Sequence, residues 1–496
     1  MSAQDQGELL LVGVGFMGRP YAAAARRLGL RVRAVETQHW TGAIAHLVDS
    51  VEPSLGQYGS LDELWAETVH AAVVKSRPTG IFGFTESHVL GAALAQDHFG
   101  LPGPSLQAAV ISRNKALQRG RFAAHGIGQP AYRLTDDLAS TAEWAATHFP
   151  VVVKPLSSAG SVGVELVADA DAFEAAAHRR AAEGALLVEK ALDGPEYSWE
   201  ALVRDGEVWF ANLTAKETTG PPHFVEVTHR TAPHLPDRDA RLVAELGRSV
   251  LTAIGMRTGI VHLEFRLTDT GPAVMEVAVR TPGDFLMELC SLTYDTDWFE
   301  LVVRLATGMD LPPAPESPTR YAASHFVISD PGKVISTDGL PEVLAHPAVV
   351  DAAFKITPGD TVAPTSSSLQ RTGHAIIAAD TPEEREEALA FVRETLKVRT
   401  EAGAGGAEPS PATPSGSSAA AARPSFDPGE VRRGSGRRGQ ADALAIGGCL
   451  ATREEFSAAR TAAESGTWTA ARRLLPRTLA DRGPGGEGNG PVVRHG

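Results

Sequence analysis

Two apolar stretches decide the fold of this sequence: Ile260-Val-His-Leu-Glu264-Phe-Arg266 and Ala273-Val-Met-Glu276-Val-Ala278-Val-Arg280. Both are rich in β-branched and large apolar residues, and the turn-forming residues at 268–271 separate them, so the pattern predicts a β-hairpin. Side chains alternate between the two faces of a strand. We therefore expect Glu264 and Glu276 to lie together on one face of the hairpin, with Arg280 beside them.

Two neighbouring carboxylates indicate a site for a hard divalent cation. Mg²⁺ is usually held by one or two carboxylates together with phosphate oxygens of a substrate, and Mn²⁺ accepts the same oxygen ligands. Glu264 and Glu276 are the predicted metal ligands. The hairpin therefore predicts a site that handles phosphate groups.

The composition is that of an ordinary globular protein. Of the 496 residues, 43% are hydrophobic and 21% are charged, a length and balance that suit several domains. The net charge of −14 argues against nucleic-acid binding. Cys290 and Cys449 give no disulfide framework. Neither a signal peptide nor a membrane-spanning run is predicted, so we expect a cytoplasmic protein without a membrane partner.

The sequence divides into four parts. In residues 1–108 strands alternate with helices, which predicts an α/β, Rossmann-like domain with a parallel sheet. Residues 109–317 form the predicted central domain, and residues 318–399 a smaller α+β lobe. Residues 400–496 are dominated by Ala, Gly, Pro and Ser, so we expect a mostly disordered tail, with a short helix at 452–475 left open.

Two local expectations follow from the same patterns. The first domain should contain strands at 8–13, Arg31–Val35, Ala71–Val74 and Gly80–Phe84. A single helical stretch, Ala108–His125, should open the central domain.

A lysine at the end of a predicted strand is followed by a loop of small residues. Small side chains allow backbone N–H groups to approach phosphate oxygens, and lysine adds a compact positive charge. Lys154 is therefore a candidate for binding nucleotide phosphates, together with the loop residues Ser157, Ser158, Gly160, Ser161 and Gly163. The alternative is a flexible surface hairpin.

Three further segments carry weaker signals. The strand ending in Glu189-Lys190-Ala-Leu192 could present its backbone to an adenine edge, and Glu196 could accept ribose hydroxyl groups, although charged strand ends are common elsewhere. The segment 216–229 has Gly and Pro at its centre, which suggests a lid. Asp284 either attracts an amine or caps the helix that begins there.

Together, the order and spacing of these segments resemble the ATP-grasp superfamily of carboxylate–amine ligases, over residues 5–399. The resemblance implies that Lys115 and Lys154 hold the phosphates of ATP; without it, Lys115 would be interpreted as a solvated surface lysine. It also implies that the segment Glu189, Lys190 and Leu192 binds adenine, with Glu196 on the ribose.

The resemblance extends to the hairpin. It implies that Glu264 and Glu276 bind Mg²⁺ and that Arg280 contacts an acyl phosphate. One position departs from the family pattern, because Ala278 stands where an asparagine metal ligand is usual. The charged ligands remain, so we expect activity, with altered metal coordination left open.

Within the superfamily, the stretches 200–229 and 320–398 look most like the L-amino-acid ligases. That resemblance implies that Glu226 and His229 lie near the substrate, which makes them catalytic candidates with Arg280. For His229 the alternative is a structural histidine beneath the lid.

A second glycine-rich motif, Gly13-Val-Gly15-Phe-Met-Gly18, follows the first predicted strand, with Glu36 near the end of the next. This pattern is typical of NAD-binding folds. The same glycines also permit tight packing of strand against helix, and proteins that resemble this family commonly carry such a domain without a cofactor. We expect packing, with NAD binding as the alternative.

The resemblance implies a two-step reaction with ATP and Mg²⁺, or Mn²⁺, as cofactors. A carboxylate takes the γ-phosphoryl group of ATP, and an amine then displaces phosphate to form an amide. The expected partners are a small-molecule carboxylate, such as an amino acid, and an amine, in specialised metabolism. Loading of an amino acid onto a carrier protein or larger amine scaffold, a nucleotide-binding regulator without catalysis, and a homodimer are left open.

Overall fold

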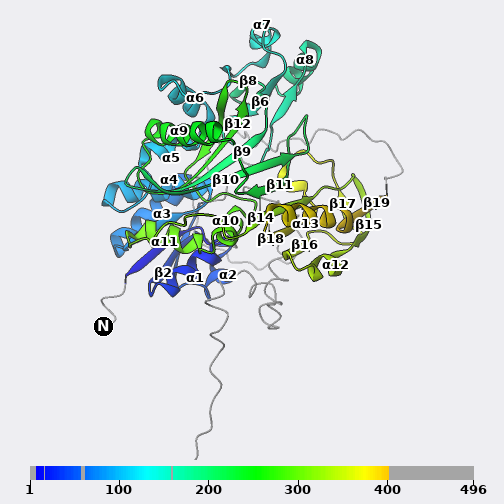
Figure 1. The fold of residues 1–496 in the computed structure, drawn as a ribbon. Helices are drawn as coiled ribbons and strands as arrows, with labels where there is room; N and C mark the ends of the chain where they lie inside the picture. The colour runs from blue at the N-terminus through cyan, green and yellow to red at the C-terminus, as the bar shows by residue number, and fades with distance from the viewer. Residues whose placement is uncertain (1–6, 16, 57–61, 158–159, 402–496) are drawn as a thin grey trace, which may run out of the picture.

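The computed structural model describes residues 7–15, 17–56, 62–157 and 160–401, and Figure 1 shows its ribbon. Within these ranges the chain forms a mixed α/β fold with four sheets, as the sequence predicts. The predicted disordered tail, apart from residues 400 and 401, and its predicted helix at 452–475 lie outside the described ranges.

The N-terminal region is an α/β unit whose parallel sheet has the strand order β3-β2-β1-β4. Leu9, Leu10 and Leu11 have no exposed surface, as expected for a strand covered on both faces. Its elements are β1 (Glu8–Val12), α1 (Arg19–Arg27), β2 (Arg31–Thr37), α2 (Thr41–Ile44), β3 (Ser50–Ser54), α3 (Asp62–Lys75), β4 (Gly80–Gly83) and α4 (Glu86–Phe99).

The predicted strand at Ala71–Val74 is wrong, because these residues form the last turns of α3. Trp65, Val69 and Val73 are buried at helical spacing, whereas Val74 is 65% exposed. One buried face is the signature of an amphipathic helix, and it explains why this apolar run does not enter the sheet.

The predicted helical stretch Ala108–His125 is two helices, α5 (Leu106–Ser112) and α6 (Lys115–Ala124). Asn114 separates them and caps α6, because its side-chain oxygen accepts from the N–H groups of Ala116 and Leu117 at 2.9 and 3.1 Å. The cap fixes Lys115 at the start of α6, with its side chain buried.

A small antiparallel sheet of strand order β5-β8-β6-β7 follows. The predicted Gly- and Ser-rich loop joins β6 to β7. The elements of this region are β5 (Tyr132–Thr135), η1 (Leu138–Thr141), α7 (Ala142–Ala146), β6 (Val151–Pro155), β7 (Glu165–Val167), α8 (Ala170–Arg179) and β8 (Leu186–Lys190).

An eight-stranded sheet of order β13-β12-β9-β10-β11-β14-β18-β16 forms the centre of the molecule. The predicted hairpin is confirmed as β12 and β13, with Glu264 directly opposite Glu276. The elements before residue 318 are β9 (Glu196–Arg204), β10 (Glu207–Thr218), β11 (Glu226–Thr231), α9 (Asp237–Ile254), β12 (Gly259–Thr268), β13 (Gly271–Ala278), α10 (Leu286–Tyr294) and α11 (Trp298–Thr307).

The C-terminal residues complete this sheet with three strands and add a three-stranded sheet, β17-β15-β19. The eight-stranded sheet thus runs across the predicted boundary between 317 and 318. The elements are β14 (Tyr321–Val327), β15 (Gly332–Asp338), α12 (Leu340–Ala345), β16 (Val349–Phe354), β17 (Thr361–Val362), η2 (Ser368–Gln370), β18 (Gly373–Ala379), α13 (Pro382–Thr395) and β19 (Lys397–Glu401).

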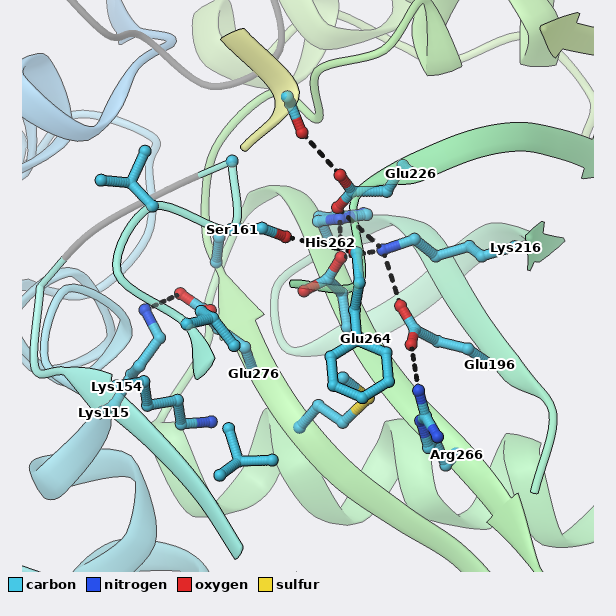
Figure 2. Close-up of a pocket in the computed structure, with 18 of the residues that line it drawn as sticks. Lys115, Lys154, Ser161, Glu196, Lys216, Glu226, His262, Glu264, Arg266 and Glu276 are labelled. Carbon is cyan, nitrogen blue, oxygen red and sulfur yellow. Dashed lines mark hydrogen bonds and ion pairs between the residues drawn. The ribbon is translucent and has the colours of Figure 1, made fainter. Parts of the chain in front are cut away.

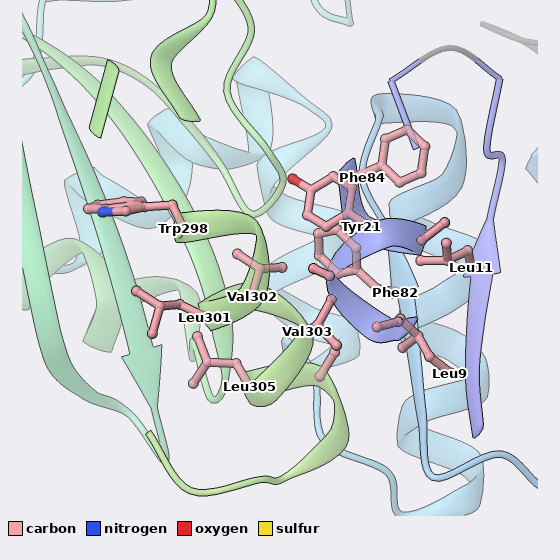
Figure 3. Close-up of a cluster of buried hydrophobic side chains, with 14 of the residues drawn as sticks. Leu9, Leu11, Tyr21, Phe82, Phe84, Trp298, Leu301, Val302, Val303 and Leu305 are labelled. Atoms are coloured by element: carbon pink, nitrogen blue, oxygen red, sulfur yellow. The ribbon is translucent and has the colours of Figure 1, made fainter. Parts of the chain in front are cut away.

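Helix α11 joins the N-terminal unit to the large sheet. Figure 3 shows Leu301, Val302 and Val303 of α11 beside Tyr21 and Phe82, within one buried apolar cluster. Each fully buried side chain of this size contributes roughly 1.5–3 kcal/mol. This packing fixes the N-terminal unit against the elements that carry the site. No helix in the part of the chain that the structure describes is long and apolar enough to cross a membrane.

Candidate active site

A pocket is lined by residues of the small sheet on one side and of the eight-stranded sheet on the other, and Figure 2 shows its charged side chains. The structure does not place three residues of the predicted phosphate-binding loop in the pocket lining. Ser157 is exposed, Gly163 is not part of the lining, and Ser158 lies outside the described residues. The predicted site residues that line the pocket are Lys115, Lys154, Gly160, Ser161, Glu189, Lys190, Leu192, Glu196, Glu226, His229, Glu264, Glu276 and Arg280.

The two carboxylates of the hairpin face one another across the strands, as predicted from their alternation. The pairing shifts next to this pair, from Glu264–Glu276 to Phe265–Val274, so Met275 is an extra residue on β13. Such bulges re-aim side chains near functional sites. The Lys115 ammonium group lies 3.0 Å from Oε1 of Glu276.

Lys216, on β10, binds the other carboxylate of the pair. Its Nζ contacts Glu264 and also lies 3.1 Å from Glu196 and 3.5 Å from Glu226. Burial alone would lower the pKa of Lys216, but the three carboxylates raise it well above its usual range. The sequence placed Lys216 only at the edge of a predicted lid, and its role depends on pairing between distant strands.

The Glu264 carboxyl is held ionised by its neighbours. Burial would raise its pKa, but the charge of Lys216 and the hydrogen bond with His262 lower it well below its usual range. A carboxyl that stays charged while buried can act as a metal ligand without first losing a proton.

Lys154 lies on the opposite side of the pocket, on β6. Its Nζ is 2.6 Å from Oε2 of Glu189, which also accepts from Arg119. Burial raises the pKa of Glu189, but Lys154 and Arg119 outweigh it and keep the carboxyl charged. The lysine is thereby fixed beside the loop residues Gly160 and Ser161.

Arg280 lies just beyond β13 and points to the N-terminal unit. Its Nε donates to Oε1 of Glu86 at 2.6 Å, at the start of α4. Burial lowers the pKa of Arg280, but the charge of Glu86 raises it overall. Glu86 was not predicted, because nothing in the local sequence joins it to the hairpin.

Glu196, the predicted ribose ligand, lies at the start of β9. Its Oε2 accepts from Nη2 of Arg266 at 3.1 Å, and the Arg266 guanidinium lies 5.3 Å from the ring of Phe224. Phe224 belongs to the predicted lid, the loop between β10 and β11. The Pro222 carbonyl of this loop accepts from the N–H of Leu166 at 3.0 Å, so the loop lies against β7.

His229 and Asp284 form a buried pair on another wall. Nε2 of His229 is 2.9 Å from Oδ2 of Asp284, and Arg371 grips the same carboxylate at 2.6 and 3.0 Å. Asp284 and Phe285 have φ of +58° and +63°, a strained conformation typical of functional sites. The N-cap residue of α10 is Phe285, whose side chain provides no capping hydrogen bond. The prediction that Asp284 caps the helix is therefore wrong.

Glu226 completes the predicted catalytic set. Its Oε2 accepts from the hydroxyl of Ser368 at 2.6 Å, and its other oxygen faces Lys216. Ser368 and Arg371 come from the C-terminal lobe, which therefore contributes directly to the pocket.

In the glycine-rich motif at 13–18, other atoms of the protein occupy the space beside Gly13 and Gly18. A Cβ atom added to Gly13 would lie 1.9 Å from the ring of His88, and one added to Gly18 would lie 2.6 Å from a backbone oxygen. The carboxylate of Glu36, which has no exposed surface, accepts from the N–H of Gly15 at 2.8 Å. These contacts favour the packing interpretation of the glycines over NAD binding.

The pocket has the chemistry that a divalent metal requires. Glu264 and Glu276 offer hard carboxylate oxygens at the pocket wall, which fits Mg²⁺. Within the described residues no three His, Cys, Asp or Glu side chains are already grouped for a metal, and Lys216 and Lys115 lie against the two carboxylates.

Comparisons with known proteins agree with this geometry. Residues 147–288 match the ATP-grasp domain family, and residues 325–401 match the family described as L-amino acid ligase C-terminal domain 2. A crystal structure of L-amino acid ligase from Bacillus licheniformis has the same fold, with a TM-score of 0.67 and 21% identity, over 80% of this chain and 99% of that one.

Curated relatives include three ligases or synthases. Carnosine synthase 1 of Gallus gallus is 27% identical over 66% of this chain, and the match spans only 38% of that protein. Dapdiamide A synthase of Enterobacter agglomerans is 25% identical, over 57% of this chain and 70% of its own length. The L-arginine-specific L-amino acid ligase of Bacillus subtilis is 20% identical, over 64% of this chain and 78% of its own length. The chain therefore carries an ATP-grasp domain, followed by a C-terminal domain of the L-amino acid ligase type.

Proposed function

We propose that this chain joins the carboxylate of an amino acid, or a similar acid, to a small amine through an acyl phosphate, with release of ADP and phosphate, in specialised metabolism. The observation that carries the proposal is the opposed pair Glu264 and Glu276 in one pocket with Lys115, Lys154 and Arg280. The printed names of the relatives, carnosine synthase, dapdiamide A synthase and L-amino acid ligase, support an amino-acid substrate.

The cationic side chains stabilise charge on the phosphates. Negative charge spreads over the oxygens of the transferring phosphoryl group, so fixed positive groups lower the barrier. Lys115 and Lys154 approach from α6 and β6, and Arg280 from the end of β13. In this proposal both lysines exchange their present carboxylate partners for phosphate oxygens when ATP binds.

The nucleoside lies along β8 and the start of β9. The backbone at Glu189 to Leu192 binds adenine, and Glu196 accepts the ribose hydroxyl groups. The Glu189 carboxylate pairs with Lys154 and Arg119, so before ATP binds its side chain holds Lys154 near the phosphate site, while its backbone faces the base.

The divalent metal is held by Glu264 and Glu276. When bound, it supplies positive charge to the phosphate oxygens. In the present structure Lys115 pairs with Glu276 and Lys216 pairs with Glu264, so each lysine would have to leave its carboxylate before the two carboxylates could hold the metal.

The second half-reaction requires that the amine lose a proton. With Nε2 of His229 donating to Asp284, Nδ1 is left as an acceptor, and it has no hydrogen-bond partner among the described residues. We assign His229 as the proton acceptor and Asp284 and Arg371 as the groups that orient it. Glu226 provides a carboxylate for the ammonium group of the amino acid.

A screen of ADP and phosphate release over amino acids, singly and in pairs, tests the proposal. Glu276→Gln should abolish ADP release because the amide lacks the negative charge with which the carboxylate attracts the cation, while Glu387→Gln, at an exposed position of α13, should change nothing. Normal turnover of the Glu276 variant would remove that residue from the metal site. Failure of the wild-type chain to bind MgATP in a calorimetric titration would overturn the whole proposal.

A further inference from the structure

A histidine lies beside the proposed metal ligands, and the proposed function assigns it no role. His262 precedes Glu264 by two positions on β12, shares its face, and pairs across the hairpin with Ala278. Its Nε2 is 3.5 Å from Oε1 of Glu264, and Figure 2 shows the imidazole next to that carboxylate in the pocket wall.

The other ring nitrogen of His262 is held by a buried carboxylate. Nδ1 lies 3.0 Å from Oε1 of Glu200, a residue with no exposed surface. Oε2 of Glu200 accepts from the Asn212 amide at 2.9 Å and from the Thr214 hydroxyl at 2.8 Å. Both carboxylate oxygens of Glu200 therefore have hydrogen-bond partners. Its contact with Nδ1 fixes the orientation of the imidazole.

This arrangement has a known chemical meaning. A metal-ligating histidine almost always donates its second ring N–H to a carboxylate or carbonyl, which orients the ring and makes its other nitrogen more basic. In a neutral imidazole whose Nδ1 donates to Glu200, Nε2 carries the lone pair, and Nε2 is the nitrogen that faces Glu264. Neighbouring ligands of an octahedral cation lie about 3 Å apart, close to the separation observed between Nε2 and Glu264.

The residue opposite His262 supports the same role. Ala278 has no metal-binding atom at the position where the resemblance expects an asparagine, and its small side chain leaves the cross-strand position to the imidazole. We propose that His262 is a ligand of the divalent cation held by Glu264, so that an imidazole nitrogen replaces the missing amide oxygen. This inference rests on the proposed function, because it presupposes that a metal binds at the hairpin.

The competing interpretation is a purely ionic one. Burial lowers the pKa of His262, but hydrogen bonds with Glu200 and Glu264 raise it to about 9. An imidazolium would be a counter-ion of Glu264, as Lys216 is, and could not bind a metal. The two roles differ in one measurable respect, which is whether a histidine nitrogen bonds directly to the cation.

Electron spin-echo envelope modulation of the full chain with Mn²⁺ and ADP makes that measurement. A directly bound imidazole should give ¹⁴N modulation that changes when the protein is grown with ¹⁵N-histidine, and this labelling excludes nitrogen of the unlabelled nucleotide. His262→Gln should abolish the histidine modulation. His229→Gln, at another histidine of the same pocket, should retain it.

A second variant separates positioning from direct binding. Glu200→Gln keeps the imidazole but removes its carboxylate partner, so Mn²⁺ affinity should fall by about 10–100-fold while the histidine modulation persists. The double variant His262→Ala with Ala278→Asn should recover part of the affinity lost in His262→Ala, because the amide oxygen then has room.

The outcomes distinguish this inference from the proposed function. Mn²⁺ that binds with nucleotide but shows no label-sensitive modulation overturns the role of His262 and leaves the ligase proposal standing. Modulation that survives in His262→Gln overturns it as well. Absence of Mn²⁺ binding in the presence of nucleotide contradicts the proposed function itself. If His262→Gln fails to fold, the isotope comparison on the unmutated chain still decides the question.

Discussion

Two glycine-rich turns of this chain look alike in sequence and differ in structure. The turn at 13–18 follows β1, and the segment 154–163 comprises the end of β6 and the loop after it. In the first, the space beside Gly13 is filled by the ring of His88, and Glu36 turns back to hold a backbone N–H. In the second, Gly160 and Ser161 line a pocket and Lys154 lies at its wall.

The contrast shows what a glycine motif can and cannot indicate. Glycine permits close approach, but it does not determine what approaches. At 13–18 the neighbour is the protein itself, whereas at 154–163 the neighbouring space is open and charged. The presence of Lys154 at the strand end, rather than the spacing of glycines, separates the two.

The largest expected effect comes from removing the charge at the second loop. Lys154→Met keeps the length of the side chain but removes positive charge from the phosphate site, so ATP-dependent phosphate release should fall about 10²–10³-fold. Circular dichroism should remain unchanged. Turnover within threefold of the unmutated chain would show that the second loop, like the first, serves packing alone.

The next effect tests the filled turn. Gly13→Ala combines a positive φ of +72° with a clash against His88, whereas Gly29→Ala has a similar φ of +75° and no neighbour within 4 Å. Gly13→Ala should therefore destabilise the protein by about 1–3 kcal/mol more than Gly29→Ala in thermal denaturation. Equal stabilities of the two variants would contradict the tight packing described for Gly13.

The smallest effect is a pH dependence at the same turn. Burial lowers the pKa of His88 to about 3, below the value of about 6.5 expected in the unfolded chain. The unfolded state therefore gains a proton first, and stability present above pH 6.5 is lost as the pH falls towards 3.

The loss can amount to about 1.4 kcal/mol per pH unit. Denaturant unfolding at pH 6.5 and 5.5 should show this extra loss for the unmutated chain relative to His88→Gln. Parallel pH profiles for the two proteins would indicate that His88 is solvated rather than packed against Gly13.

Local patterns predicted the elements whose signals are local. The β12–β13 hairpin follows from alternation around a turn. The strand predicted at Ala71–Val74 was wrong because consecutive valines occur both in strands and in helices with a buried face. The helical period becomes visible only when the buried residues Trp65 and Val69 are included.

The predicted site residues that line the pocket came from motifs, and their roles remain predictions. The partners that fix them could not be predicted, because each comes from a distant segment. Glu86 reaches Arg280 from the N-terminal unit, Arg371 reaches Asp284 from the C-terminal lobe, and Lys216 meets Glu264 only through sheet pairing. Such pairs carry no pattern within any single stretch of sequence.

The ammonium groups of Lys115 and Lys216 have a consequence for the order of loading. Each carboxylate of the hairpin is paired with a lysine ammonium group, so magnesium alone would have to displace that lysine before it could bind. A nucleotide that binds together with its metal would bring phosphate groups that pair with the displaced Lys115, while Lys216 would keep Glu196 and Glu226 as partners. Metal and nucleotide should therefore enter as one unit, and excess free magnesium should do little to prime the protein beforehand.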